Sequence, residues 1–122
     1  MEPKSTHILL VENEEPLCSQ LAEALRAAGY TVDLARSGRE ALNRAEQTRY
    51  TRVILDLNLP DINGILVYLM LRGIDPDLRQ HTLFVATALP EPYSHEELST
   101  LGLGYVSKPF APQELLQKLS VR

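Results

Sequence analysis

Short, uninterrupted apolar runs alternate along this chain with segments that have the spacing of amphipathic helices. The runs are rich in β-branched residues and predict buried strands at residues 8–11, 31–35, 52–57, 82–88 and 105–107. The segments between them predict helices at residues 16–28, after Ser37, and at residues 65–71, 94–101 and 112–119. Such alternation requires a parallel sheet with helices on both faces, so the predicted fold is an α/β doubly wound domain.

Composition narrows the class of protein further. A length of 122 residues predicts one domain spanning 1–122. The net charge is −4, without a long run of like charge, which argues against direct nucleic-acid binding. The longest apolar stretch, residues 65–71, is far shorter than the roughly 20 residues of a membrane span. One cysteine cannot form an internal disulfide, so a cytoplasmic location is expected.

Polar side chains follow several of the predicted strands. Glu12 and Asn13 follow the first strand, Asp56 lies near the end of the third, Thr87 lies near the end of the fourth, and Lys108 follows the fifth. Ligands bind outside the carboxyl ends of the strands in sheets of this kind, so we expect these groups to meet there. Asp56 stands alone in an apolar run, and a buried carboxylate needs a cation nearby.

Two cations fit Asp56: the Lys108 ammonium and a divalent metal ion. Oxygens from Glu12, Asn13 and Asp56 suit Mg²⁺, which prefers oxygen ligands. A zinc site is disfavoured because the three histidines are scattered and Cys18 lies within a helix, so we interpret these four residues as structural or surface residues. A carboxylate beside Mg²⁺ and lysine can attack phosphorus, and the Thr87 hydroxyl can then donate to a phosphoryl oxygen.

Four strings carry a resemblance to a known family: ILLVENEEP, VILDLNLPDING, FVATA and YVSKPF. In this order and spacing they resemble the receiver domain of two-component response regulators over essentially the whole chain. The resemblance implies a flavodoxin-like sheet with strand order 2-1-3-4-5, flanked by five helices. It also implies a signalling domain that is not a metabolic enzyme.

The resemblance also assigns roles to individual residues. Asp56 would be the phosphoacceptor, and Thr87 and Lys108 would hold the phosphoryl group. The metal site would be formed by Glu12, Asn13, Asp56 and the backbone carbonyl of Asn58. Tyr105 occupies the position of a switch aromatic that moves inward with Thr87, and the Lys108–Pro109 bond would be cis.

This chain departs from the family pattern at several positions, which include Glu12, longer than the commoner aspartate, and residues 101–104, which differ from the usual turn before the fifth strand. Asn13 replaces the usual aspartate, which removes one negative charge and predicts weaker Mg²⁺ binding. Glu14 either supplies a third acid or points away. In the loop after Thr87, the prolines at positions 90 and 92 predict a stiffened connection, and the apolar Leu89 predicts slow loss of phosphate.

The main hypothesis is a receiver that accepts phosphate from a histidine kinase or phosphotransfer protein onto Asp56 and then acts on a downstream effector. The alternative is a receiver-like interaction domain that does not use phosphorylation, which Asn13 motivates. A phosphatase is disfavoured because Asn58 stands where a second acid would be needed. A flavin-binding domain is disfavoured because no phosphate-binding loop follows the first strand.

Partner surfaces are harder to predict from the sequence. The family favours a homodimer through the fourth helix, fifth strand and fifth helix. Within these helices, Leu98, Leu115 and Leu119 fit core positions better than an exposed surface. Four apolar residues of the third helix are also predicted to lie in the core: Ile65, Leu66, Leu69 and Met70.

Overall fold

Five parallel strands form one sheet in the computed structural model, which describes residues 6–87 and 94–120. The strand order is β2-β1-β3-β4-β5, and every neighbouring pair is parallel. The strands are β1 His7–Val11, β2 Thr31–Ala35, β3 Arg52–Asp56, β4 Thr82–Ala86 and β5 Gly104–Ser107. This confirms the predicted doubly wound α/β class and the strand order that the resemblance implied.

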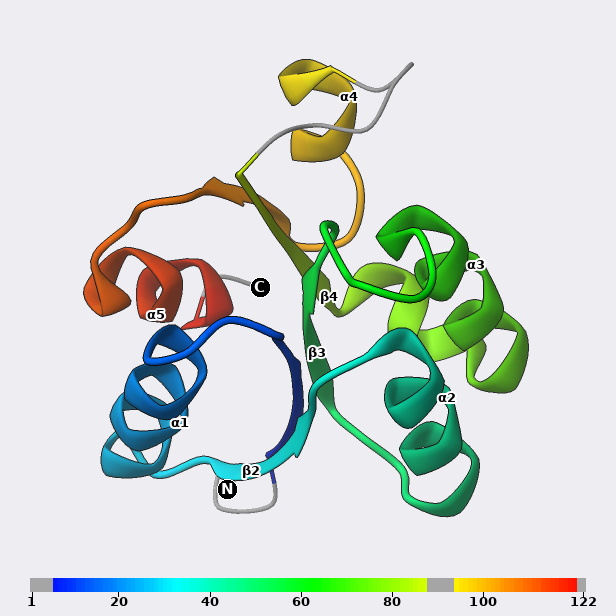
Figure 1. Ribbon diagram of the computed structural model, residues 1–122, viewed down its shortest axis with the longest axis horizontal. Helices are drawn as coiled ribbons and strands as arrows, with labels where there is room; N and C mark the ends of the chain where they lie inside the picture. Colours follow the sequence, from blue (N-terminus) through cyan, green and yellow to red (C-terminus); the bar gives the residue numbers. More distant parts are fainter. Residues whose placement is uncertain (1–5, 88–93, 121–122) are drawn as a thin grey trace.

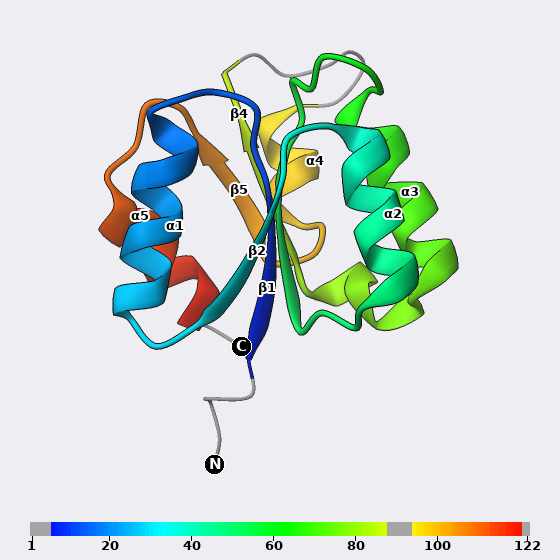
Figure 2. The same cartoon turned by 60° about the horizontal axis from the view of Figure 1, so that its bottom comes forward.

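Helices cover both faces of the sheet (Figure 1). They are α1 Leu17–Ala27, α2 Gly38–Gln47, α3 Gly64–Ile74, the 3₁₀ helix η2 Pro76–Gln80, α4 His95–Ser99 and α5 Pro112–Ser120. Helices α1 and α5 lie on one face, and α2, α3 and α4 lie on the other (Figure 2). No helix in the described part of the chain is long and apolar enough to cross a membrane.

The strands feed two hydrophobic clusters because successive side chains point to opposite faces of the sheet. In β1, Leu9 and Val11 pack towards α2 and α3, whereas Ile8 and Leu10 pack towards α1 and α5. Each of these four side chains is fully buried. Burying a side chain of this size contributes about 1.5–3 kcal/mol, so these alternating positions stabilise both helical layers on one sheet.

Helix starts are set by polar caps, with some differences from the prediction. The Ser37 hydroxyl accepts from the Glu40 N–H at 3.1 Å, but the Glu40 carboxylate accepts from the Arg36 N–H at 2.8 Å. The predicted capping box is therefore only half formed. A complete capping box occurs at Ser94 and Glu97, which fixes the start of α4.

Helix α3 and the segment after it also differ from the prediction. The helix continues through Gly73 to Ile74 instead of closing near Arg72. Asp75 then caps η2, an element that was not predicted, by accepting from the Asp77 N–H at 3.1 Å. Strand β4 ends at Ala86, and the predictions for residues 88, 89, 90 and 92 lie outside the described residues.

The core prediction for α3 was wrong at three of its four positions. Ile65 is buried, but Leu66, Leu69 and Met70 are exposed by 48%, 49% and 44%. A helix that packs on a sheet buries only one side, and in α3 that side carries Ile65, Tyr68 and Leu71. By contrast, Leu98, Leu115 and Leu119 are buried, which confirms the core interpretation of those residues.

Candidate functional site

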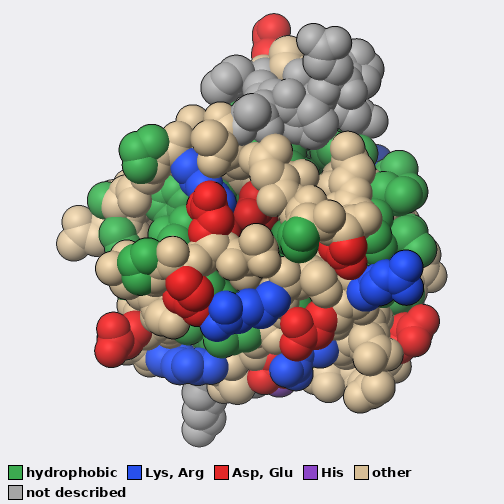
Figure 3. Space-filling view, in the orientation of Figure 1, with side chains coloured by type: hydrophobic (Ala, Val, Ile, Leu, Met, Phe, Trp, Pro, Cys, Tyr) green, Lys and Arg blue, Asp and Glu red, His purple; other side chains and the backbone are tan. Residues whose placement is uncertain are grey.

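Three of the predicted strand-end residues converge at the carboxyl edge of the sheet. Glu12 follows β1 directly, Asp56 is the last residue of β3, and Lys108 follows β5. The sheet hydrogen-bond pattern continues into both flanking positions, since the Glu12 N–H donates to the Ala35 carbonyl and the Lys108 N–H to the Ala86 carbonyl, each at 3.0 Å. On the face viewed in Figure 3, acidic side chains gather beside a basic one in the area between β3 and β5 of Figure 1.

Lys108 is the centre of this cluster. Its Nζ donates to Glu12 Oε2 at 2.9 Å, to Glu14 Oε1 at 2.8 Å and to Asp56 Oδ2 at 3.2 Å. An ammonium group has three protons to donate, so these three carboxylates use its full hydrogen-bonding capacity. The predicted proximity of Lys108 and Asp56 is thus present in the structure.

Most of this charge is removed from solvent. The side chains of Glu12 and Asp56 are each 1% exposed and that of Lys108 is 7% exposed, whereas Glu14 is 58% exposed. Isolated buried charges cost several kcal/mol each, so the carboxylates and the lysine depend on one another. The direction of Glu14 was left open by the sequence, and its carboxylate points into the cluster.

One cation for three carboxylates affects the acid–base behaviour of the site. Burial, opposed by the Lys108 hydrogen bond and reinforced by the Asp56 charge, raises the pKa of Glu12 to about 7. Burial alone would lower the pKa of Lys108, but its hydrogen bonds to Glu14 and Glu12 outweigh burial and hold that pKa above the ordinary value. Lys108 therefore stays charged at neutral pH, and Glu12 binds a proton more readily than an ordinary glutamate does.

Backbone N–H groups orient the two buried carboxylates. Asp56 Oδ1 accepts from the Asn58 N–H at 2.9 Å, while its other oxygen faces Lys108. Glu12 Oε2 accepts from the Glu14 N–H at 3.1 Å. These contacts fix the side chain of Asp56 at the end of β3, with one oxygen on a turn and the other on a cation.

Thr87 and Tyr105 occupy different environments. Thr87 is exposed just beyond β4, and its N–H donates to Asn58 Oδ1 at 2.9 Å, which ties the segment after β4 to the segment after β3. Tyr105 is 9% exposed and belongs to the core cluster on the α2 and α3 face. The Lys108–Pro109 bond is cis, as the resemblance implied.

The oxygen atoms at this edge are of the kind that Mg²⁺ prefers. Glu12 and Asp56 offer two buried carboxylates, and with all three acids ionised the cluster including Lys108 carries a net charge of −2, which a divalent cation would balance. Asn13 is exposed. Within residues 6–87 and 94–120, no group of three or more His, Cys, Asp and Glu residues is arranged to hold a metal. Mg²⁺ binds through one or two carboxylates with retained water, so the two buried carboxylates are compatible with this ion.

A cleft of about 450 Å³ adjoins the cluster. Glu14, Thr87 and Lys108 form its polar wall, and Leu17, Gln20 and Phe110 form much of the rest. The last three were not identified from the sequence. Leu17 and Gln20 follow the same helical spacing as the rest of α1, so nothing in the sequence marks them as residues that line a cleft. Phe110 lies in an irregular segment, where no helix or strand pattern predicts the direction of its side chain.

Sequence comparisons show that the chain is similar to response regulators and transcriptional regulatory proteins. The family model for the response regulator receiver domain matches residues 8–120. Response regulator ArlR of Staphylococcus epidermidis is 35% identical over 120 residues, covering 93% of this chain and 51% of that protein. Transcriptional regulatory protein PrrA of Mycobacterium leprae is 30% identical over 115 residues, covering 94% and 48%. The chain thus spans about half the length of these curated relatives.

Solved structures show the same fold. Chemotaxis protein CheY4 of Vibrio cholerae has a TM-score of 0.79 and 28% identity, covering 93% of this chain and 95% of that one. A response regulator of Burkholderia pseudomallei, described with a phosphorylated aspartic acid, a calcium ion and citrate, has a TM-score of 0.80 and 23% identity, covering 96% and 68%. The architecture around the cluster is therefore one that occurs in many proteins.

Proposed function

The chain belongs to the response regulator receiver domain family of two-component signal transduction, and we propose that its Asp56 is the residue that accepts the phosphoryl group. The observation that carries this proposal is a carboxylate 1% exposed at the end of β3, with one oxygen 3.2 Å from the Lys108 ammonium. A buried carboxylate at a strand end beside a cation is suited to nucleophilic chemistry rather than to stability alone.

The proposed reaction is a transfer from a phosphohistidine. An Asp56 carboxylate oxygen forms a bond to phosphorus while the phosphorus–nitrogen bond of the donor breaks, and the imidazole leaves with its electron pair and takes up a proton. Lys108 stabilises the negative charge on the phosphoryl oxygens, and the Thr87 hydroxyl donates to one of them. The cleft beside Glu14, Thr87 and Lys108 gives the donor access to this edge.

Mg²⁺ is the proposed cofactor. Glu12, Asn13, Asp56 and the backbone carbonyl of Asn58 would hold it. When bound, the ion supplies positive charge that lowers repulsion between Asp56 and the incoming phosphoryl group. The charge of the carboxylate cluster supports this assignment, because a divalent ion would balance the acids that Lys108 leaves uncompensated. Asn13 provides an oxygen without a charge, so weak binding is part of the proposal.

Phosphorylation would change the contacts of Lys108. The new phosphoryl oxygens compete with Glu12 and Glu14 for its three protons, and they draw the Thr87 hydroxyl inward. Tyr105 follows this movement as the switch residue. The change alters the surface formed by α4, β5 and α5, which is the proposed route to an effector domain or protein and to a possible homodimer.

The proposed partners are a histidine kinase or phosphotransfer protein upstream and an effector downstream, with residues 1–122 acting as one receiver domain. Nucleic acid and membranes are not proposed as direct partners, and the proposed location is the cytoplasm. The domain would assist its own phosphorylation and dephosphorylation without being a metabolic enzyme. The alternative, a receiver that works without phosphorylation, is not favoured by the family membership.

A phosphodonor assay tests the assignment of Asp56. Incubation with acetyl phosphate and MgCl₂, followed by intact mass measurement, should give one phosphate adduct, because the buried carboxylate is the nucleophile. Asp56→Asn should abolish the adduct, and Asp77→Asn, which changes an exposed carboxylate on η2, should retain it. An adduct that persists in Asp56→Asn contradicts the assignment, and no adduct in the unmodified chain supports the phosphorylation-independent alternative.

A metal titration tests the role of position 13. Asn13→Asp adds a negative charge beside Glu12, so it should tighten Mg²⁺ binding by about tenfold, or about 1.4 kcal/mol. Isothermal titration calorimetry measures this directly. The matched control is Asn43→Asp, an exposed position in α2 that should leave the affinity unchanged. Equal affinities in all three proteins would show that position 13 does not face the ion.

A further inference from the structure

Helix α3 presents an apolar stripe to solvent. Leu66, Leu69, Met70 and Ile74 are exposed by 48%, 49%, 44% and 37%, and they are the large hydrophobic side chains most exposed among the described residues. Their spacing of three, four and eight positions from Leu66 places them on one side of the helix. Figure 3 shows hydrophobic side chains along the edge of the molecule that α3 occupies in Figure 1. We call this stripe, with the groove beside it, the α3–η2 face.

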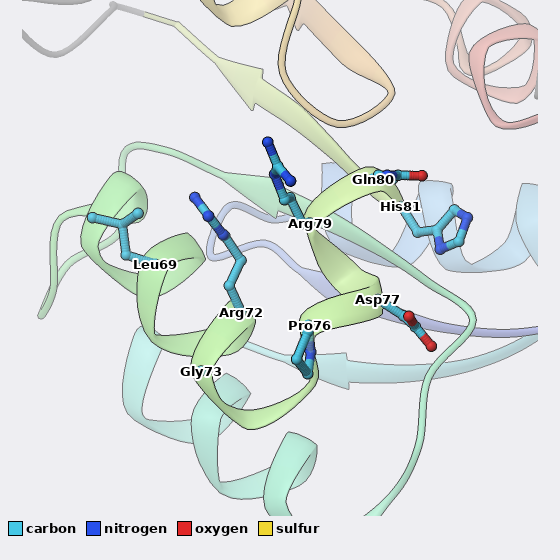
Figure 4. Close-up of a pocket in the computed structure, with 8 residues that line it drawn as sticks. All are labelled: Leu69, Arg72, Gly73, Pro76, Asp77, Arg79, Gln80 and His81. Carbon is cyan, nitrogen blue, oxygen red and sulfur yellow. The ribbon is translucent and has the colours of Figure 1, made fainter.

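The groove lies between α3 and η2 and has a volume of about 600 Å³. Leu69 and Arg72 line it from α3, and Asp77 and Arg79 line it from η2. In Figure 4 the side chains of Arg72 and Arg79 extend in the same direction, whereas Asp77 extends the other way. The stripe is thus continuous with a concave surface whose polar groups include two guanidinium groups on one side.

Both arginines belong to a well-packed framework. The Arg72 guanidinium carbon lies 5.5 Å from the centre of the Tyr68 ring, which allows a cation–π contact. The Tyr68 hydroxyl donates to the Arg79 carbonyl at 2.8 Å, and the Tyr68 ring packs edge to face on Phe84. Because Tyr68 is 2% exposed, it fixes α3 and η2 relative to each other, and a partner would meet a surface that is already formed.

The charge of the groove selects the chemistry of its occupant. The whole chain has a net charge of −4, so two neighbouring arginines beside an apolar stripe stand out against an acidic protein. We propose that the α3–η2 face docks an amphipathic helix of a partner protein. The apolar residues of that helix cover Leu66, Leu69 and Met70, and its acidic residues meet Arg72 and Arg79.

A second copy of the chain fits this surface less well. In an antiparallel pair of α3 helices centred on Leu69 and Met70, the two Arg72 side chains would lie close together, and like charges repel. An acidic helix instead gains from both arginines.

A membrane surface also fits poorly. Lipid headgroups attract clusters of about four to eight basic residues, and the groove has Arg72 and Arg79 with Asp77 beside them. A flat bilayer cannot fill a concave groove, whereas side chains of a helix can. The proposal does not depend on phosphorylation of Asp56, because it rests on α3 and η2 alone.

Selection from a displayed peptide library tests the proposal. The library consists of helices of about 15 residues, with apolar residues fixed at the i, i+3, i+4 and i+7 positions and the other positions randomised, so that each peptide can span α3. Selection on the whole chain should enrich peptides rich in Asp and Glu. Fluorescence anisotropy then gives affinities for the synthesised peptides.

Variants of the chain locate the binding surface. Leu69→Ser, or Met70→Ser if the first is unstable, and the double change Arg72→Glu with Arg79→Glu should each lower the affinity by about tenfold or more. Arg39→Glu reverses the charge of an exposed arginine on α2 and is the matched control, with an expected change of less than about twofold. Thermal unfolding followed by circular dichroism verifies that each variant is folded.

Several results would overturn the proposal. They are enrichment of basic or neutral peptides, failure to enrich any peptide, or enriched peptides that bind the α3 and arginine variants as tightly as the unmodified chain. A dimer in sedimentation experiments that Leu69→Ser dissociates would assign the face to a second copy. Binding to phosphatidylserine vesicles that Leu69→Ser abolishes would assign it to a membrane.

Discussion

The carboxyl edge of the sheet and the α3–η2 face depart from the usual distribution of side chains in opposite directions. At the edge, Glu12 and Asp56 are charged groups that are 1% exposed. On the face, Leu66 and Leu69 are apolar groups that are about half exposed. Burying charge costs stability, and exposing apolar surface risks unwanted association. Departures of this kind are expected where a protein binds or reacts, so the two regions define two surfaces to test.

The two regions also differ in what holds them in place. The edge is held by polar contacts between residues distant in sequence, with Lys108 within 3.2 Å of carboxylates from two other strand ends. The face is held by ordinary packing of one helix and the segment that follows it. A substitution at the edge should therefore disturb the whole domain, whereas one on the exposed side of α3 should disturb only binding.

The largest expected effect comes from removing the Lys108 ammonium. Lys108→Met leaves Glu12 and Asp56 buried without their cation, and the free energy of unfolding should fall by about 3–5 kcal/mol at pH 8. Urea denaturation without added metal measures this loss. Lys118→Met, which changes an exposed lysine in α5, should stay within about 0.5 kcal/mol of the unmodified chain. A loss below about 1 kcal/mol for Lys108→Met would show that the buried charges do not depend on it.

The second effect is a pH dependence of the free energy of unfolding, which we expect from the carboxyl edge and not from the α3–η2 face. The pKa of Glu12 is raised from 4.5 to about 7, so between these values the folded chain holds a proton that the unfolded chain has lost. Its contribution to stability is therefore present below about pH 4.5 and disappears as the pH rises to about 7, a change on the order of 3 kcal/mol. Glu12→Gln should flatten this part of the stability profile.

Urea denaturation at several pH values between 5 and 8, without divalent ions, measures the slope. Leu69→Ser is the control from the other region, because it changes no titratable group and should keep the profile of the unmodified chain. The raised pKa would be disproved by parallel profiles for Glu12→Gln and the unmodified chain.

The smallest expected effects on the free energy of unfolding come from glycine substitutions near the two ends of α3. A Cβ at Gly64 would lie 2.4 Å from the Leu57 Cα, so Gly64→Ala should lower the free energy of unfolding by about 1–3 kcal/mol. At Gly73, on the exposed side, a Cβ would have no atom within 4 Å, and Gly73→Ala should raise the free energy of unfolding by about 0.5–1 kcal/mol. Chemical denaturation of both variants gives the comparison, and a shared sign would contradict it.

Much of the edge was predictable because each of its parts has a local signal. The strands are runs of apolar residues that suit a sheet buried on both faces, and Asp56 is a charged residue inside such a run, flanked by Leu55 and Leu57. Once parallel strands are inferred, their carboxyl ends must lie together, which brings Lys108 to Asp56. Glu14 lacked such a signal, because its direction depends on the backbone path after β1.

The α3–η2 face was not predictable for the same kind of reason. Residues 65–71 are apolar at every position, so they have no polar side from which to infer how the helix is turned on the sheet. Tertiary packing decides that Tyr68 faces inward and Leu69 outward. The 3₁₀ helix did have a readable start, since Asp75 followed by Pro76 is a capping residue before a favoured first helical residue.

The close approach at Gly64 has a mechanical consequence. The Gly64 N–H also donates to the Leu57 carbonyl at 3.2 Å, so the first turn of α3 rests on the residue that follows Asp56, with no space between them for even one methyl group. Because these two segments are already in close contact, neither can move toward the other. A shift of the backbone beyond Asp56 toward α3 would therefore press directly on the first turn of that helix.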